Sequence, residues 1–364
     1  MSETIMKEEE RIAFALRALY RNYGYLPYKM NKFETYDLYV ANKEFLLGDG
    51  VIAFNDTDGK LLALKPDVTL SIIKNDVDGG GKRKVCYNEN VYRISEKTKH
   101  FKEIMQVGLE CIGDVDGYDV FESVYLAAGS LAAISQNFVL DISHLGILSA
   151  VLDEIGVGES FNRSVMQKIA EKNLHELKTL CDKAGVTEDK QQPLVALVQA
   201  YGMPDKVLPA LMQICQSDKA KAAFEELKVL WALLKTTPYA NNIRIDFSVV
   251  NDMNYYSDIV FKGFIDGIGE GVLSGGRYDK LLSRMGRKSG GIGFAVNLDL
   301  LEGFGVEKRT TDVDALVLYD DKTDVKEVAK TVQSLVQEGY SVTAQKTKGA
   351  VRYQKLVDLT GGKQ

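Results

Sequence analysis

Apolar residues near the start of the chain recur every three or four positions. Between Glu8 and Tyr23 they form one stripe of a predicted helix that Gly24 would end (Ile12, Leu16, Leu19 and Tyr20). Shorter apolar runs separated by turn residues follow and predict strands at 45–47, 51–54, 61–64, 72–74, 85–93 and 104–112. The last two runs flank a charged segment, so an antiparallel pair is their simplest arrangement.

The middle of the chain returns to helical spacing. Tyr118–Asn137 predicts a helix, and Phe138–Ser143 a strand after it. From about residue 158 to 240 helical periodicity dominates, which predicts a helical insertion (Phe224, Leu227, Trp231 and Leu234 are one such series). Strands are then expected at 243–250 and 256–264, a glycine-rich stretch at 267–276 and a helix at 278–285.

The last fifty residues have the pattern of a separate α/β segment. A strand at Ala315–Tyr319, a helix at Thr323–Glu338 and a strand at Ser341–Ala344 predict a parallel pair with a right-handed crossover. We therefore expect an α+β fold with two parts. The first is residues 1–310, an antiparallel sheet with flanking helices and the insertion, and the second is residues 311–364.

Composition narrows the possible functions. The chain has 364 residues, a net charge of −6 and a pI near 5.4, which does not favour a nucleic-acid backbone as partner. No run approaches the roughly 20 apolar residues of a membrane span, and the charged N-terminus has no signal-peptide core. The four cysteines and three histidines are scattered, so neither a metal site nor a disulfide is expected. A cytoplasmic protein without membrane contact is the interpretation.

Polar residues interrupt the apolar runs at the segment Leu64-Lys-Pro-Asp-Val-Thr69. Asp67 and Thr69 follow a predicted strand and begin an apolar helix. Both residue types favour helix caps, so a purely structural role competes with a ligand-binding one.

A second polar cluster lies on the two long strands. Gln106 and Glu110 alternate with apolar residues, so they share one strand face with Gly108 between them, and Arg93 ends the preceding strand. A carboxylate, an amide and a guanidinium could bind a small polar ligand that carries an ammonium and a carboxylate. An ordinary solvent-facing side of an antiparallel pair is equally consistent with the pattern.

The third cluster combines Tyr255 and Tyr256 with the segment Ser274-Gly-Gly-Arg-Tyr-Asp279. Paired tyrosines usually pack in a core, and the two glycines would allow close backbone approach. The nearby glycines do not have dinucleotide-binding spacing. The Asp320-Asp321 pair after a strand lacks the loop that a phosphoribosyl site needs, so it is interpreted as a solvated strand end.

Together these segments occur in an order that resembles the class II histidyl-tRNA synthetase core, over about residues 8–304. Leu64-Lys-Pro-Asp-Val-Thr69 is similar to that family's Arg-Pro-Glu-Gly-Thr segment, and Val91–Ser95 resembles motif 2. The remaining segments resemble the histidine-binding strand, the histidine-specific signature, the Gly-Gly-Arg-Tyr segment and motif 3 (106–110, 249–256, 274–278 and 293–300). The resemblance implies that eight residues surround histidine: Asp67, Thr69, Arg93, Gln106, Glu110, Tyr255, Tyr256 and Tyr278.

The departures from the synthetase pattern concern ATP. Asn251 stands where the signature has arginine, Leu300 where motif 3 has arginine, and Ser95 where motif 2 has glutamate. Adenylation needs cations on the ATP phosphates, so this site is expected to be inactive. The tail would be only the first half of an anticodon-binding domain.

A synthetase-like body that keeps histidine and loses ATP and tRNA resembles the regulatory subunit of short-form ATP phosphoribosyltransferase, the HisZ family. That resemblance implies no catalytic residue, no cofactor, and a role in activating a short catalytic subunit and in its feedback inhibition by L-histidine. It also implies a homodimer within a hetero-oligomer, with Glu8–Tyr39 at the dimer interface. The alternatives are a free-standing histidine sensor, an authentic histidyl-tRNA synthetase, and an RNA-binding relative that does not charge tRNA.

Overall fold

The computed structural model describes residues 7–43, 46, 50–75, 81–95, 98–249, 255–304 and 311–361. The chain divides into two compact units, Met1–Glu302 and Gly303–Gln364. The predicted strand at 45–47 lies mostly outside the described residues, and Asn251 lies outside them too.

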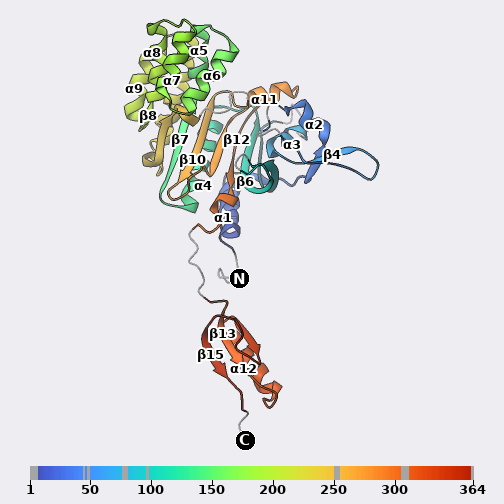
Figure 1. The fold of residues 1–364 in the computed structure, drawn as a ribbon. Coiled ribbons are helices and arrows are strands. Elements are labelled where there is room, and N and C mark those ends of the chain that lie inside the picture. The colour runs from blue at the N-terminus through green and yellow to red at the C-terminus, as the bar shows by residue number, and fades with distance from the viewer. Residues whose placement is uncertain are drawn as a thin grey trace. The chain divides into compact units, whose positions relative to one another are not determined.

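A nine-stranded sheet forms the centre of the first unit within its described part (Figure 1). Its strand order is β1 (Leu26–Pro27), β5 (Arg83–Ile94), β6 (Phe101–Gly113), β12 (Gly290–Asn297), β11 (Leu273–Arg277), β10 (Ile259–Ile265), β7 (Phe138–His144), β9 (Ile243–Asp246) and β8 (Tyr201–Gly202). Neighbours β5 and β6 are antiparallel, which confirms the pairing expected for the two long strands.

The sheet is mixed, so the expectation of an antiparallel sheet was too simple. Strand β1 runs parallel to β5, and β7 runs parallel to β9. Parallel neighbours need a long crossover connection. Between β7 and β9 that connection is the helical insertion, and between β1 and β5 it is the segment that contains the small sheet described below.

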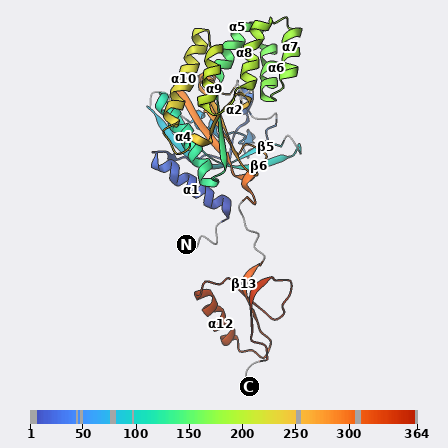
Figure 2. The same cartoon turned by 90° about the vertical axis from the view of Figure 1, so that its left-hand side faces the viewer.

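Two helices cover one face of the large sheet (Figure 2). Helix α1 (Glu8–Asn22) buries Ile12, Leu16 and Tyr20, as the predicted stripe requires. Helix α4 (Gly117–Ile134) begins at Asp116, whose side chain accepts from backbone N–H groups of the first turn. The Tyr20 hydroxyl lies 2.9 Å from Ser130 Oγ and joins the two helices. The opposite face of the sheet therefore remains open for a site.

Helices of the insertion gather at one end of the unit (Figure 1). They are α5 (Leu145–Ile155), α6 (Glu159–Ala170), α7 (Leu174–Lys183), α8 (Glu188–Gln199), α9 (Pro204–Ile214) and α10 (Asp218–Leu234), followed by the short η3 (Ala240–Asn242). The apolar series on α10 is buried, as its period predicts. Helix α5, before residue 158, was not predicted.

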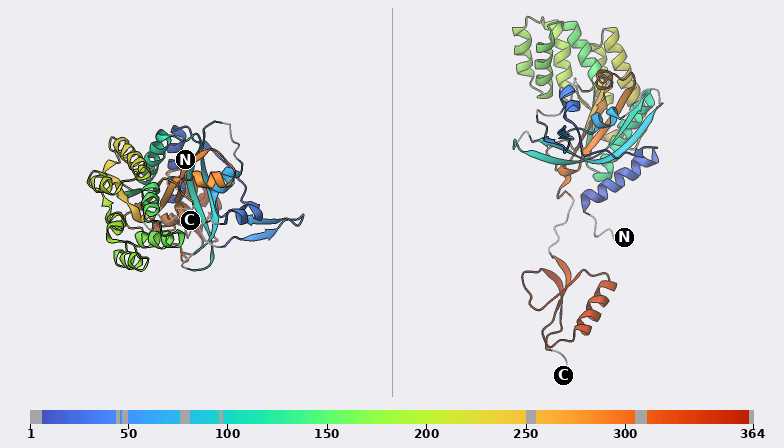
Figure 3. Two further views of the ribbon diagram at one scale, coloured as in Figure 1. Left: turned by 90° about the horizontal axis from the view of Figure 1, so that it is seen from above. Right: turned by 90° about the vertical axis from the view of Figure 1, so that its right-hand side faces the viewer.

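A small three-stranded sheet lies beside the large one, with the order β2 (Phe33–Thr35), β4 (Leu61–Leu64) and β3 (Ala53–Asn55). Figure 3 shows its blue hairpin extending away from the larger sheet. Helices α2 (Tyr36–Ala41) and α3 (Val68–Lys74) belong to the same region. The strand predicted at 72–74 is wrong, because Asp67 caps a helix there that buries every residue from Val68 to Ile73.

The boundaries near the glycine-rich stretch also differ from the prediction. Strand β10 begins at Ile259, so Tyr255 and Tyr256 precede it, and strand β11 takes the end of the stretch. The strand expected at 243–250 ends early, and η4 (Phe247–Val249) follows it. Helix α11 (Asp279–Arg284) and η5 (Leu298–Leu301) complete the first unit.

The second unit contains β13 (Val313–Leu318), α12 (Val325–Gln337), β14 (Val342–Gln345) and β15 (Tyr353–Asp358). Its sheet order is β14-β13-β15, with both pairs parallel. The predicted strand–helix–strand pattern is confirmed, but β15 was missed. Its short apolar run is interrupted by a lysine on an edge strand, which hides the strand signal.

Among the described residues, no helix is long and apolar enough to cross a membrane. The same residues bring together no group of three potential metal ligands. All four cysteines are free and buried.

Candidate functional site

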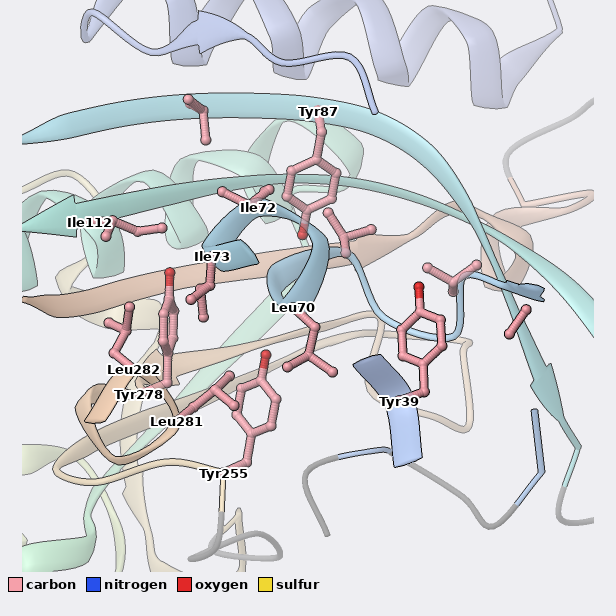
Figure 4. Close-up of a cluster of buried hydrophobic side chains, with 14 residues drawn as sticks. Tyr39, Leu70, Ile72, Ile73, Tyr87, Ile112, Tyr255, Tyr278, Leu281 and Leu282 are labelled. Atoms are coloured by element: carbon pink, nitrogen blue, oxygen red, sulfur yellow. The ribbon is translucent and has the colours of Figure 1, made fainter. Parts of the chain in front are cut away.

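A cavity of about 290 Å³ lies on the open face of the large sheet, between the sheet and helix α3. All eight residues that the sequence singled out line it: Asp67, Thr69, Arg93, Gln106, Glu110, Tyr255, Tyr256 and Tyr278. They come from five separate segments of the chain. Figure 4 shows Tyr255 and Tyr278 pointing toward α3 from one side, and Tyr87 pointing toward it from β5.

Glycines hollow the floor of this cavity. In the strand register Glu110 lies beside Gly293, and Gly293 beside Gly276. A Cβ atom at Gly293 would collide with the Glu110 carboxylate, and one at Gly276 would meet the Tyr256 ring. The missing side chains therefore let Glu110 and Tyr256 lie flat against the sheet.

Glu110 is the most enclosed charged group of the site, with 2% of its surface exposed. Thr69 Oγ1 donates to its Oε1 and the Tyr278 hydroxyl to its Oε2, both at 2.7 Å. Burial raises the pKa of Glu110 to about 8, although these two hydrogen bonds lower it. At neutral pH this carboxyl therefore retains its proton in most molecules until a cationic ligand group arrives.

Asp67 caps a helix and also lines the cavity. Its Oδ1 accepts from the backbone N–H of Leu70 at 2.9 Å, which caps α3, while its side chain also lines the cavity. Burial raises the pKa of Asp67 above its usual value, and the Arg93 guanidinium, 3.7 Å away, opposes that shift. The same aspartate therefore belongs both to the helix cap and to the cavity wall.

Hydrogen bonds from the second polar cluster fix its orientation. Arg93 Nε donates to the Pro66 carbonyl at 2.7 Å, which holds the guanidinium at the cavity wall. Gln106 Nε2 donates to Asn297 Oδ1 at 2.8 Å. The expected shared face of Gln106 and Glu110 is confirmed, because both line the cavity, and it does not face bulk solvent.

The tyrosines form one wall. The rings of Tyr255 and Tyr256 are 4.8 Å apart, and those of Tyr255 and Tyr278 are 6.2 Å apart, both edge to face. Burial raises the pKa of the Tyr278 hydroxyl well above its usual value, so it remains a hydrogen-bond donor. A wall of three aromatic rings suits a flat, polar ring.

Sequence reasoning missed several lining residues, most importantly Tyr87 and Lys262. Tyr87 is the register partner of Gly108, and a Cβ atom at that glycine would collide with the Tyr87 hydroxyl. The space that Gly108 leaves is therefore filled by a tyrosine. A large residue that pairs with a glycine on the neighbouring strand would indicate this arrangement, but the pairing is known only from the strand register.

Two of the three positions that depart from the synthetase pattern are described. Ser95 follows β5 directly, and Leu300 lies in η5 just beyond β12. Neither residue lines the cavity. Neither carries a charge that could meet a nucleotide phosphate.

The family model described as histidyl-tRNA synthetase matches residues 2–301 of this chain. The chain belongs to the histidyl-tRNA synthetase family. This confirms the class II aminoacyl-tRNA synthetase-like α+β fold expected from the motif order, with the mixed sheet as its one refinement.

Curated relatives share the regulatory name. The chain is 28% identical over 304 residues to an ATP phosphoribosyltransferase regulatory subunit of Oceanobacillus iheyensis, which covers 82% of this chain and 75% of the relative. It is also 28% identical over 352 residues to the protein of that name from Clostridium kluyveri, covering 92% of this chain and 88% of the relative.

Solved structures show the same fold. A Bacillus halodurans protein described as an ATP phosphoribosyltransferase regulatory subunit/histidyl-tRNA synthetase has a TM-score of 0.79 at 23% identity, covering 99% of this chain and 97% of that one. The histidyl-tRNA synthetase of Nostoc has a TM-score of 0.73 at 19% identity, with 93% and 82% coverage. A chain of the ATP phosphoribosyl transferase (HisG:HisZ) complex of Thermotoga maritima has a TM-score of 0.63 at 18% identity, with 80% and 97% coverage.

Proposed function

We propose that this chain is a non-catalytic regulatory subunit of ATP phosphoribosyltransferase, the enzyme of the first step of histidine biosynthesis. It activates a short catalytic subunit and transmits feedback inhibition by L-histidine. The observation that carries the proposal is the cavity in which all eight expected histidine-binding residues meet, while the described positions for ATP contacts are Ser95 and Leu300. The names of the curated relatives support the same function.

The chemistry of the cavity matches the three parts of histidine. Glu110, Asp67 and Thr69 provide oxygen atoms for the α-ammonium, and Arg93 provides a guanidinium for the α-carboxylate. The tyrosine wall, with Gln106, receives the imidazole ring. Asp67 stands where the synthetase family has a glutamate, and it also caps α3. Its shorter side chain therefore reaches less far toward the ammonium than a glutamate would.

Loss of the ATP contacts makes the protein a sensor instead of a ligase. Arginines that would hold the phosphates are replaced by Asn251 and Leu300 in the sequence, and Ser95 replaces the adenine-side glutamate. We infer that no aminoacyl-adenylate forms. The catalytic chemistry belongs to the partner, and this chain acts through binding that favours one state of the assembly.

The test is reconstitution with a short catalytic subunit. We expect formation of N1-phosphoribosyl-ATP to rise when the purified full-length chain is added, and histidine to inhibit only the mixture. Glu110→Ala should preserve activation and abolish inhibition. Activation by the wild-type chain without any effect of histidine would refute the feedback function.

Two alternatives give other outcomes. A histidyl-tRNA synthetase, which the family match favours, would show histidine-dependent exchange of pyrophosphate into ATP. A free-standing histidine sensor would bind histidine but neither bind nor activate the catalytic subunit. We expect neither result, and we place the subunit as a homodimer within the hetero-oligomer.

A further inference from the structure

A fully buried lysine lies directly behind the part of the cavity wall that carries Asp67. Lys65 follows strand β4, precedes Pro66, and has 0% of its surface exposed. Its ammonium donates to Glu89 Oε2 on β5 at 2.9 Å, and the Glu89 side chain is 16% exposed. Burial lowers the pKa of Lys65, and the bond to Glu89 opposes that shift. One carboxylate therefore holds the charge of Lys65 inside the protein.

Neither member of this ion pair belongs to the ligand-binding surface. Lys65 and Glu89 do not line the cavity, although residues beside them do. Glu89 is the register partner of Gln106, so both lie on the open face of the sheet. Any effect of the pair on a ligand must therefore pass through the residues that the pair holds in place.

Stability alone does not explain an ion pair in this position. The cost of removing two charges from water offsets much of their attraction, and apolar residues of similar volume often stabilise a fold equally well. What the pair adds is direction, because its nitrogen and oxygen must meet at hydrogen-bond distance. The bond between Lys65 and Glu89 is thus suited to fixing the segment that begins at Lys65 against strand β5.

That segment is attached to β5 at three points. The Lys65 side chain meets Glu89, and the Lys65 carbonyl accepts from the Tyr92 N–H at 2.9 Å. The Pro66 carbonyl accepts from Arg93 Nε at 2.7 Å. Along β5 these partners span four residue steps, or roughly 13 Å at the rise of a strand. The ion pair is the outermost of the three attachments, and it therefore limits sliding of the segment along the strand.

Arg93 is the cavity residue that depends most on this attachment. Its bond to the Pro66 carbonyl fixes the plane of the guanidinium, which is rigid and binds carboxylates in a defined direction. A shift of Pro66 along β5 would turn that plane away from a ligand. Asp67, the next residue of the segment, lies 3.7 Å from the same guanidinium on the cavity side. The ion pair behind the wall therefore acts on the group that faces a ligand carboxylate.

We infer that Lys65 and Glu89 are positioning residues of the cavity. Their ion pair fixes Pro66 against β5 and so aims the Arg93 guanidinium at the carboxylate of the bound amino acid. This inference rests on the proposed function in taking that amino acid to be histidine, with Arg93 at its carboxylate. It adds a specificity device, because the cavity then favours a ligand with a carboxylate over the same ligand without one.

The experiment compares L-histidine with L-histidinol, which has a hydroxymethyl group in place of the carboxylate. Calorimetric titration of the full-length protein gives both affinities, and their ratio measures the carboxylate contact. We expect Lys65→Met to lower the ratio about tenfold, the value of one charge-assisted hydrogen bond, with little change for histidinol. Glu89→Gln keeps the shape of the side chain and a neutral acceptor, so it should lower the ratio about fivefold.

Lys74→Gln is the matched control. Lys74 is the last residue of α3 and pairs with Glu34 of β2, so this variant also removes an ion pair that holds the same helix. It should change the ratio less than about twofold. A double variant, Lys65→Met with Glu89→Met, replaces the buried pair by apolar side chains. It should recover the melting temperature of the wild type and keep the low ratio.

The outcomes separate this inference from the proposed function. An unchanged ratio in Lys65→Met, whether both affinities fall together or neither falls, would overturn the positioning function. If that variant does not fold, a wild-type ratio in Glu89→Gln or in the double variant would overturn it as well. Wild-type protein that binds neither ligand would refute the histidine sensor and this inference with it.

Discussion

The two ends of the cavity are built differently. At one end Glu110 is enclosed by Thr69 and Tyr278, and both of its oxygens accept hydrogen bonds. At the other end the stem of Lys262 lies against Gly271, and its charge acts on Asp141 without a hydrogen bond in the described chain. Both ends lie on one sheet face, but one contains a buried carboxyl group and the other an ammonium group.

The difference shows how a buried charge can be kept ready for a ligand. Burial keeps Glu110 protonated at neutral pH, although the hydrogen bonds from Thr69 and Tyr278 lower its pKa, and Glu110 releases that proton to receive a cation. At the lysine end no hydrogen bond within the described chain orients the ammonium of Lys262, whose side chain is only partly buried. The carboxyl end is therefore preorganised, and changes there should have larger effects on binding.

The largest expected effect is that of Glu110→Ala. Removing the carboxyl leaves the α-ammonium of histidine without its charged partner, and we expect affinity to fall about 100-fold or more, as for a buried charge pair that loses one member. Calorimetric titration with L-histidine measures it. Glu103→Ala, on the exposed part of the same strand, is the control and should bind as the wild type does.

Gly293→Ala tests whether the glycine floor is required. The new Cβ atom would occupy the place of the Glu110 carboxylate and press on the backbone of β6. We expect histidine affinity to fall about 30-fold and stability to fall by about 1–3 kcal/mol, the usual cost of overpacking. Gly269→Ala, where a Cβ atom meets nothing within 4 Å, should leave both unchanged. Normal histidine binding by Gly293→Ala would show that Glu110 is not part of the histidine site.

The pH dependence of binding sharpens the same comparison. Because the pKa of Glu110 is about 8 in the free protein, histidine must displace a proton to meet the ionised carboxylate at pH 7. Affinity should therefore rise about fivefold between pH 7 and pH 8, as the ionised fraction of Glu110 grows. Titrations in two buffers of different ionisation enthalpy measure the released proton. An affinity that is constant over this range, or the same slope in Glu110→Gln, would contradict the assignment.

A smaller effect is expected from Tyr278→Phe. It removes one of the two donors to Glu110, and we expect affinity at pH 7 to fall about fivefold, the value of one net hydrogen bond. Because that bond lowers the pKa of Glu110, the pH profile should also move upward. Tyr118→Phe, at an exposed tyrosine of α4, is the control. An unchanged pH profile would mean that Tyr278 only fills space.

Much of the fold was readable from the sequence. The helical stripe of α1, the antiparallel pairing of β5 with β6 and the buried series on α10 all follow from apolar period. The strand predicted at 72–74 was wrong because a short apolar run fits a buried helix as well as a strand. Here Asp67 caps the N-terminus of a helix that contains this run. Strand β15 was missed because its lysine breaks the apolar pattern.

Within the site, the sequence determined which residue types were available, and the motif order indicated which of them belong together. The tertiary structure alone decided that Tyr87 fills the space above Gly108, that Gly293 makes room for Glu110, and that Lys262 lies in the same cavity. These facts depend on strand register, which aligns residues as far apart in the sequence as Gln106 and Asn297. A local pattern contains no information about which strand will be its neighbour, because that choice is made by packing of the whole sheet.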